Sequence, residues 1–100
     1  MFGTVAKLKF KPGMMKKFME ENLEQYENPD SGSVAVLAFD TLDEPNTALL
    51  VAVSESEEAY KKNADDPKTH ERFMKMMEYL ESEPEWNDGH VIYSKLYKSF

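Results

Sequence analysis

The chain contains no cysteine, so it can form neither a disulfide bond nor a thiolate-based metal or catalytic site. Basic residues are also in deficit, with 12 Lys and Arg against 19 Asp and Glu and a net charge of −7. The negative electrostatic potential of such a chain repels nucleic acid and anionic membrane surfaces. No apolar run approaches the roughly 20 residues of a membrane span. No signal peptide is evident at the start of the chain. We therefore expect a cytoplasmic protein with no nucleic-acid and no membrane partner.

Two stretches of the chain, Val34–Phe39 and Ala48–Val53, are apolar at every position. A half-exposed strand alternates apolar and polar residues, because successive side chains point to opposite faces of the sheet. These stretches do not alternate, which predicts strands in a sheet that is covered on both faces. A chain of 100 residues suits a single domain, residues 1–100, and has few helices with which to cover two faces.

The hydrophobic periodicity predicts seven elements in the order β-α-β-β-α-α-β. We expect strands over residues 2–10, 33–41, 47–53 and 90–97, and helices over residues 14–27, 56–64 and 67–82. Pro84 is expected to end the last helix. This order is typical of the α+β class with a ferredoxin-like fold, in which helices pack on one face of a four-stranded antiparallel sheet.

Local signals support these boundaries. Asp43–Asn46 predicts a hairpin turn between two antiparallel strands, and Asn87–Gly89 predicts a turn into the last strand. Ser54–Glu57 has the spacing of a capping box, with the Ser54 hydroxyl accepting from the amide three residues on. Asp66 is expected to cap the last helix, with Pro67 in its first turn.

The second face of this sheet has no helix to cover it. Three of the four predicted strands place Val, Leu, Ile or Tyr side chains there, a larger apolar patch than monomers usually expose. Two sheets packed face to face about a two-fold axis would bury the patch. We therefore expect a homodimer that closes into an α+β barrel.

Three motifs suggest a family. Lys11–Gly13 enters a helix, the apolar hairpin runs into Ser54–Tyr60, and Asp66-Pro67 is followed by Pro84–Gly89. With these motifs the whole chain resembles the dimeric α+β-barrel superfamily and, within it, the antibiotic biosynthesis monooxygenase-like proteins. The resemblance implies a cofactor-independent monooxygenase acting on an aromatic or polyketide-like phenol, with no cofactor and no metal. Such an enzyme deprotonates its substrate, and the resulting anion reacts directly with oxygen.

The chain departs from the family pattern at three positions. Members often carry tryptophan where this chain has Ser54, and many carry histidine where it has Asn63. The heme-degrading branch uses asparagine on the first strand, where this chain has Ala6. These departures argue against heme binding and degradation. They leave a non-catalytic homodimeric module that binds a small ligand as the alternative to an enzyme.

The candidate catalytic residues are His70, Asn63 and Tyr60, on the two helices expected to line a pocket. An imidazole at His70 can exchange protons near neutral pH, although a solvated or capping histidine is the alternative. Asn63 could orient a phenol or dioxygen, or simply end its helix. Tyr60 could donate to a substrate oxygen, or pack on an amphipathic surface.

The candidate substrate-binding residues are Trp86, Phe73 and Met77. Trp86 could stack on an aromatic ligand, or plug the core or a dimer contact. Phe73 and Met77 share the side of the helix that carries His70. Methionines on the covering helices could form a pliable pocket wall or ordinary core packing. His90 is far in sequence from the other histidine, so no transition-metal site is predicted.

Overall fold

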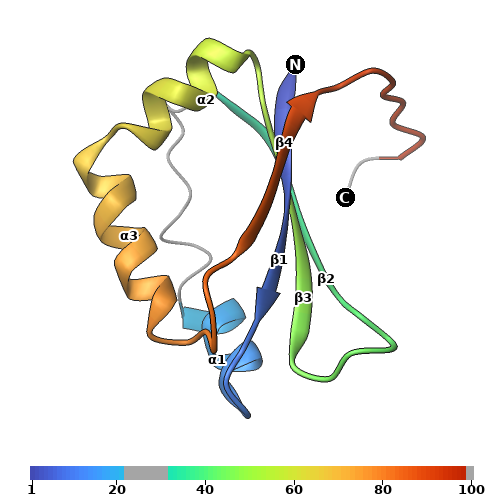
Figure 1. Cartoon of the computed structure of the whole chain (residues 1–100). Coiled ribbons are helices and arrows are strands. Elements are labelled where there is room, and N and C mark those ends of the chain that lie inside the picture. Colours follow the sequence, from blue (N-terminus) through green and yellow to red (C-terminus); the bar gives the residue numbers. More distant parts are fainter. Residues whose placement is uncertain (22–31, 99–100) are drawn as a thin grey trace.

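A computed structural model of the chain describes residues 1–21 and 32–98. Its elements are β1 (Phe2–Lys9), α1 (Met14–Glu21), β2 (Ser33–Asp40), β3 (Thr47–Ser54), α2 (Glu57–Ala64), α3 (Pro67–Met77) and β4 (Glu85–His90). The four strands form one antiparallel sheet in the order β2-β3-β1-β4. The helices lie on one side of this sheet, which confirms the ferredoxin-like α+β fold (Figure 1).

Strand β1 lies inside the sheet and separates its two faces. Five alternate residues face the helices and are all buried: Phe2, Thr4, Ala6, Leu8 and Phe10. Val5 lies on the opposite face and is 41% exposed. The core forms where α1 meets the end of β1, with the rings of Phe10 and Phe18 5.3 Å apart and Met76 and Leu80 packed beside them. The alternation predicted for this strand is confirmed.

The apolar segments form the predicted hairpin, β2 and β3. Leu37 lies opposite Val51, and Asn46 in the connecting turn adopts the left-handed conformation at φ 57°. Val36 and Leu37 point to opposite faces of the sheet, yet they are 47% and 45% exposed. The described part of one chain therefore leaves β2 about half exposed on both faces.

Helix α1 begins at Met14, after a turn in which Gly13 has φ 78°. This left-handed conformation favours glycine, because a Cβ atom would strain it. The helix is described to Glu21, and the remainder of the helix predicted over 14–27 lies outside the described residues.

The cap of α2 differs from the predicted one. Ser54 is the last residue of β3 and pairs with Phe2 across the sheet, so its backbone belongs to the strand. The cap is Ser56, whose hydroxyl accepts from the Ala59 amide at 3.0 Å. The cap of α3 is confirmed, since the Asp66 carboxylate accepts from the Lys68 amide at 2.9 Å and Pro67 follows it.

Helix α3 ends at Met77, so the predicted end near Ser82 is wrong. Backbone bonds to the end of β1 divert the chain: the Lys11 amide donates to the Tyr79 carbonyl at 2.9 Å, and the Glu81 amide donates to the Lys9 carbonyl at 2.8 Å. The helix thus ends because of tertiary pairing, and Pro84 lies beyond it.

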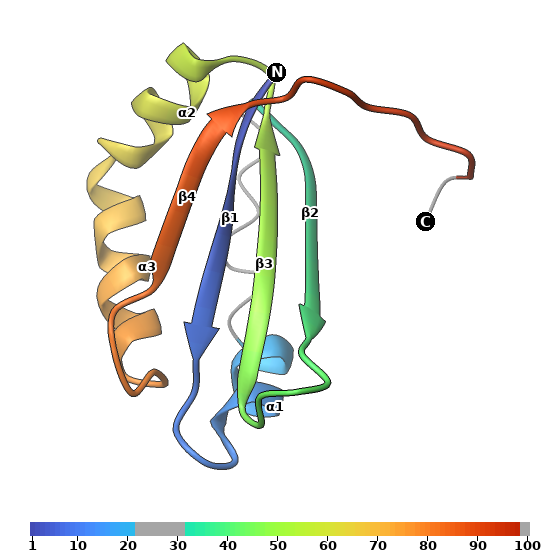
Figure 2. The same cartoon turned by 45° about the vertical axis from the view of Figure 1, so that its right-hand side comes forward.

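The last strand is also shifted from its predicted place at 90–97. Asn87–Gly89, predicted as a turn, lies within β4 (Glu85–His90), where Asp88 pairs with Thr4. The Asn87 side-chain amide also donates to the Val5 carbonyl at 3.1 Å. Residues 91–98 leave the sheet at its end and extend away from it (Figures 1 and 2). We call this segment the C-terminal arm.

Candidate functional site

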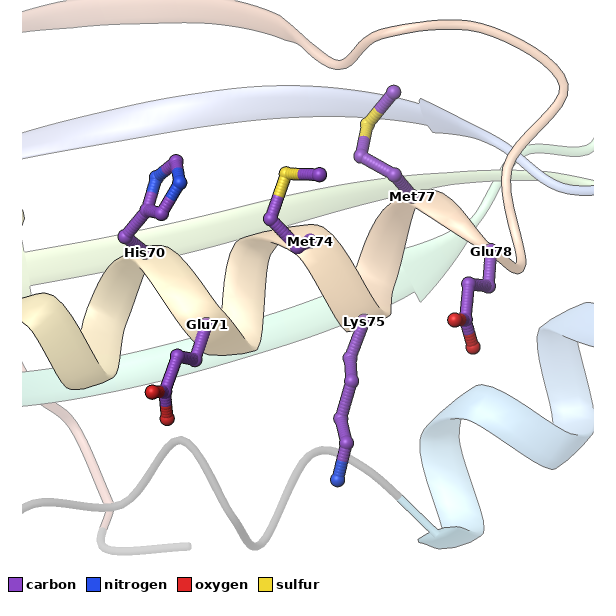
Figure 3. Close-up of a pocket in the computed structure, with 6 residues that line it drawn as sticks. All are labelled: His70, Glu71, Met74, Lys75, Met77 and Glu78. Carbon is purple, nitrogen blue, oxygen red and sulfur yellow. The ribbon is translucent and has the colours of Figure 1, made fainter.

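An open depression runs along α3. Its volume is about 530 Å³, and its lining comprises His70, Glu71, Met74, Lys75, Met77 and Glu78. Figure 3 shows that His70, Met74 and Met77 project from one side of the helix, whereas the three charged residues project from the opposite side. The depression thus combines an apolar stripe of two methionines with one imidazole.

His70 lies in the first turn of α3, where its amide donates to the Asp66 carbonyl at 3.2 Å. Its side chain is exposed at the depression and shares the helix face of Met74 and Met77, four and seven residues further on. Phe73 is half-buried and packs on the core cluster beneath the helix. Two of the predicted site residues, His70 and Met77, therefore share one cavity.

Tyr60 belongs to a second group, which we call the tyrosine cluster: Tyr60, Asp88, Thr4 and Phe2. The Tyr60 hydroxyl donates to Asp88 Oδ1 at 3.1 Å, and the ring lies 5.0 Å from that of Phe2. Burial raises the pKa of Tyr60 above its usual value of 10.0, and the charge of Asp88 and the hydrogen bond to it act in the same direction. The hydroxyl is thus kept in its protonated form.

The Thr4 hydroxyl is the buried polar atom of the tyrosine cluster. Thr4 is 4% exposed, and its Oγ1 makes no hydrogen bond of ordinary geometry with the rest of the described chain. Its proximity to Tyr60 slightly opposes the rise in that residue's pKa. Next to the cluster, His90 Nε2 lies 3.6 Å from Glu57 Oε2, and the His90 ring meets Phe2 edge-on at 5.1 Å.

The two remaining predicted residues lie apart from both groups. Asn63 stabilises the junction of α2 and α3, because its side-chain oxygen accepts from the Thr69 hydroxyl at 3.5 Å and its carbonyl accepts from the Asp66 amide at 3.2 Å. Trp86 lies opposite Ala6 on the helix-covered face of β4 and is 44% exposed.

Sequence reasoning missed Asp88, the partner of Tyr60, because Asn-Asp-Gly is typical of a turn. A usable signal was present nonetheless. Trp86, Asp88 and His90 recur at the period of two that places side chains on one face of a strand.

Residues 1–21 and 32–98 contain neither a cluster of imidazole and carboxylate side chains that could hold a metal ion nor a helix that could span a membrane. No three His, Asp or Glu side chains in these ranges come close enough to hold a metal ion. None of the helices described there has the length and apolar character needed to cross a membrane.

No family model matches the chain, and no curated protein matches it in sequence. Solved structures do match its fold. A conserved protein from Methanosarcina mazei Go1 is 22% identical, with a TM-score of 0.70 over 88% of this chain and 89% of its own. A protein from Chloroflexus aurantiacus J-10-fl, provisionally named an antibiotic biosynthesis monooxygenase, has a TM-score of 0.77 at 14% identity, over 94% of this chain and 95% of its own.

The fold is that of the antibiotic biosynthesis monooxygenase-like proteins. An Arabidopsis thaliana protein also shares it, with a TM-score of 0.75 at 19% identity over 96% of this chain and its own whole length. At these identities the likeness concerns the fold, because one fold supports many activities. Within the antibiotic biosynthesis monooxygenase-like fold, the depression and the tyrosine cluster both lie on the helix-bearing side of the sheet.

Proposed function

We propose that this protein is a cofactor-independent monooxygenase that oxidises an aromatic or polyketide-like phenol in the depression along α3. The observation that carries the proposal is the depression itself, with the His70 imidazole beside Met74 and Met77. Its volume of about 530 Å³ falls within the roughly 300–1,000 Å³ of small-molecule sites. The likeness in fold to proteins provisionally named as such monooxygenases supports the same conclusion.

The proposed chemistry needs one base and an apolar surface. His70 takes the proton of the phenolic hydroxyl, and the electron-rich anion passes electrons to dioxygen. A C–O bond forms at an activated CH₂ carbon of the substrate, and the O–O bond breaks. One oxygen atom stays as a carbonyl, and the other leaves as water with the two hydrogens of that carbon. His70 then returns its proton to the phenolate oxygen of the product. The substrate supplies all the electrons, while the two methionines accommodate its rings.

Oxygen consumption with a panel of anthrones, which carry such a CH₂ carbon, tests this proposal. We expect His70→Ala to lower the rate about 100-fold or more, because a positioned base contributes roughly 10²–10⁴-fold. His90→Ala is the matched control, since it removes the other imidazole, which lies beside Glu57 outside the depression. Equal rates for the wild type and both variants would rule out His70 as the base.

Four of the predicted site residues, Tyr60, Asn63, Trp86 and Phe73, do not line the depression. Their predicted roles therefore require a substrate that extends beyond it. Asn63→Ala in the same assay tests whether Asn63 orients the phenol or dioxygen, or serves only in its contact with Thr69. An unchanged rate would leave Asn63 as a residue of the helix junction alone.

We also propose that the protein is one domain, residues 1–100, that dimerises through the sheet face opposite the helices. Val5, Leu37 and Phe39 on that face are 41–51% exposed, and the apolar side chains of β3 between them are only half-buried. Burial against a second sheet removes this patch from water. Light scattering at micromolar concentration should give twice the chain mass of 11.6 kDa, and a stable monomer would contradict the dimer. A cytoplasmic location stays a prediction.

A second candidate function is a non-catalytic homodimeric module that binds a small ligand. It is favoured by the open shape of the depression and by the engagement of Tyr60 and Asn63 in contacts elsewhere. Quenching of Trp86 fluorescence by an anthrone, without any oxygen consumption, would support this candidate over the enzyme.

A further inference from the structure

Helix α3 carries three uncharged donor side chains in a row. His70, Met74 and Met77 project from the same side of the helix and line one depression (Figure 3). The imidazole offers a nitrogen lone pair, and each thioether offers a lone pair on sulfur. We call these three residues the donor row. It presents one nitrogen and two sulfur atoms to the same open space.

The surroundings of the donor row leave its atoms available to a ligand. Met74 is 55% exposed, whereas Met76, two residues further on, is 2% exposed and belongs to the core. Core packing therefore does not explain a methionine at position 74. No hydrogen bond or ion pair joins the His70 imidazole to any other described residue, whereas the His90 imidazole lies beside a carboxylate. Met77 packs on the core and fixes one end of the row.

The spacing along the helix allows these atoms to meet at one ion. His70 and Met74 are four residues apart, and Met74 and Met77 are three apart. Both separations place side chains next to each other on one helix face, with about 5–6 Å between their Cβ atoms. A pair of histidines four residues apart holds a single zinc ion in H-E-x-x-H sites, so this reach suffices for coordination. The unbranched methionine side chain has three rotatable bonds with which to bring its sulfur to the ion.

The chemistry of these atoms selects a soft metal ion. Thioether and imidazole ligands suit Cu(I), whereas Mg²⁺, Ca²⁺ and Mn²⁺ prefer carboxylate, carbonyl and water oxygens. Glu71 and Glu78, the carboxylates of the depression, project from the opposite side of the helix (Figure 3). The chain has no cysteine, so no thiolate competes for a soft ion. The prediction that no transition-metal site exists rests on histidine and cysteine, and thioethers lie outside it.

Charge favours a monovalent cation at this place. The lining of the depression includes two carboxylates, of Glu71 and Glu78, and one ammonium group, of Lys75. A histidine that binds a metal is neutral, so the lining has one negative charge in excess, which a monovalent cation neutralises. The net charge of −7 on the whole chain attracts cations as well.

We propose that the donor row of α3 binds a soft monovalent metal ion of the Cu(I) type, with His70 and Met74 as its main ligands and Met77 as the third. This site goes beyond the oxygenase proposed above and does not depend on it, because coordination needs only the lone pairs of three side chains. One consequence concerns both. An ion on His70 occupies the lone pair with which this residue would accept a phenolic proton, so metal binding and phenol oxidation exclude each other at the depression.

Methyl NMR of the full-length chain, with ¹³C in its methionine methyl groups, tests the site residue by residue. Ag(I) in chloride-free buffer is the probe, because it shares the ligand preferences of Cu(I) and keeps its oxidation state in air. We expect one equivalent of Ag(I) to shift the methyl signals of Met74 and Met77. Met1 is the internal control and should not shift, because it is 49% exposed but lies outside the depression. Mg²⁺, a hard ion, should shift none of these signals.

Substitution of the donors measures their contribution to affinity. Met74→Leu keeps a side chain of similar volume but removes the sulfur. It should raise the Ag(I) dissociation constant about 10-fold or more, since the loss of even an outer-shell partner costs about 10–100-fold. His70→Ala should have an effect at least as large. Met76→Leu is the matched control, because it removes a sulfur from the same helix at a buried position. Isothermal titration calorimetry of the four proteins measures the affinities.

The outcomes separate this site from non-specific binding and from the proposed oxygenase. Saturation at one ion per chain, with shifts at Met74 and Met77 and weaker binding by both donor variants, supports the site. Parallel shifts of the exposed methionines, Met1 included, overturn it, as do equal affinities of the wild type and Met74→Leu. Anthrone oxidation that is absent both with and without Ag(I) overturns the oxygenase alone, because the NMR shifts do not require turnover.

Discussion

Both faces of this sheet carry apolar side chains, but along β1 one face is buried and the other is not. On β1, Leu8 faces the helices and is fully buried, whereas Val5 faces the other way and is 41% exposed. Phe18, Met76 and Leu80 close the first face from above. Nothing in the described chain closes the second. Apolar strand residues therefore require that a sheet face be buried. Whether the same chain can bury that face depends on how many helices it has.

Of the substitutions that distinguish the two faces, those in the core are expected to change the free energy of unfolding most. Leu8→Ala should lower the free energy of unfolding by about 2–5 kcal/mol, because the lost side chain leaves a cavity among buried neighbours. Val5→Ala removes a smaller, half-exposed side chain from the same strand and should cost less than about 1 kcal/mol in the monomer. Urea denaturation at a protein concentration below the dimer dissociation constant measures both. Equal losses would mean that the second face is not bare.

A charge at the same outer position should affect association and spare the fold. We expect Val5→Glu to raise the dimer dissociation constant about 100-fold, since a carboxylate would be buried at the centre of two packed sheets. The far-ultraviolet circular dichroism spectrum should stay unchanged. Leu42→Glu is the matched control, because Leu42 is 99% exposed beyond the end of β2. Sedimentation equilibrium of both variants checks the prediction, and undiminished dimerisation of Val5→Glu would contradict a face-to-face interface.

The sequence predicts the helix-covered side of the fold well because its signals there are local. Alternation along β1, the Asp66 cap and the hairpin turn depend on residues close in the chain. The errors occur where distant segments compete with local signals. Asn87–Gly89 resembles a turn, but pairing with β1 makes it a strand, and pairing of residues 79–81 with the end of β1 stops α3 early.

The candidate site shows the same division. His70 and Met77 meet in the depression because they are seven residues apart on one helix, a spacing that periodicity predicts. The contact between Tyr60 and Asp88 joins residues 28 positions apart, so only the register of β4 against β1 reveals it. Long-range register is the information that a single sequence lacks.

The smallest predicted effect lies at the edge of the helix-covered face, where a polar contact replaces apolar packing. Tyr60→Phe removes the hydrogen bond to Asp88 and should lower the free energy of unfolding by about 0.5–1 kcal/mol at pH 8. Because the pKa of Tyr60 is raised in the folded state, this contribution is complete below pH 10 and is lost as the pH rises through the folded pKa. The difference in Tm between the wild type and Tyr60→Phe should therefore shrink from pH 8 to pH 11.

Asp88→Asn keeps an acceptor without the charge and should bring the pKa of Tyr60 back toward its usual value, as ultraviolet titration can measure. A difference in Tm that is constant over this pH range would show that the Tyr60 hydroxyl contributes nothing through its protonation, and that the edge of the covered face is stabilised by ring packing against Phe2 alone.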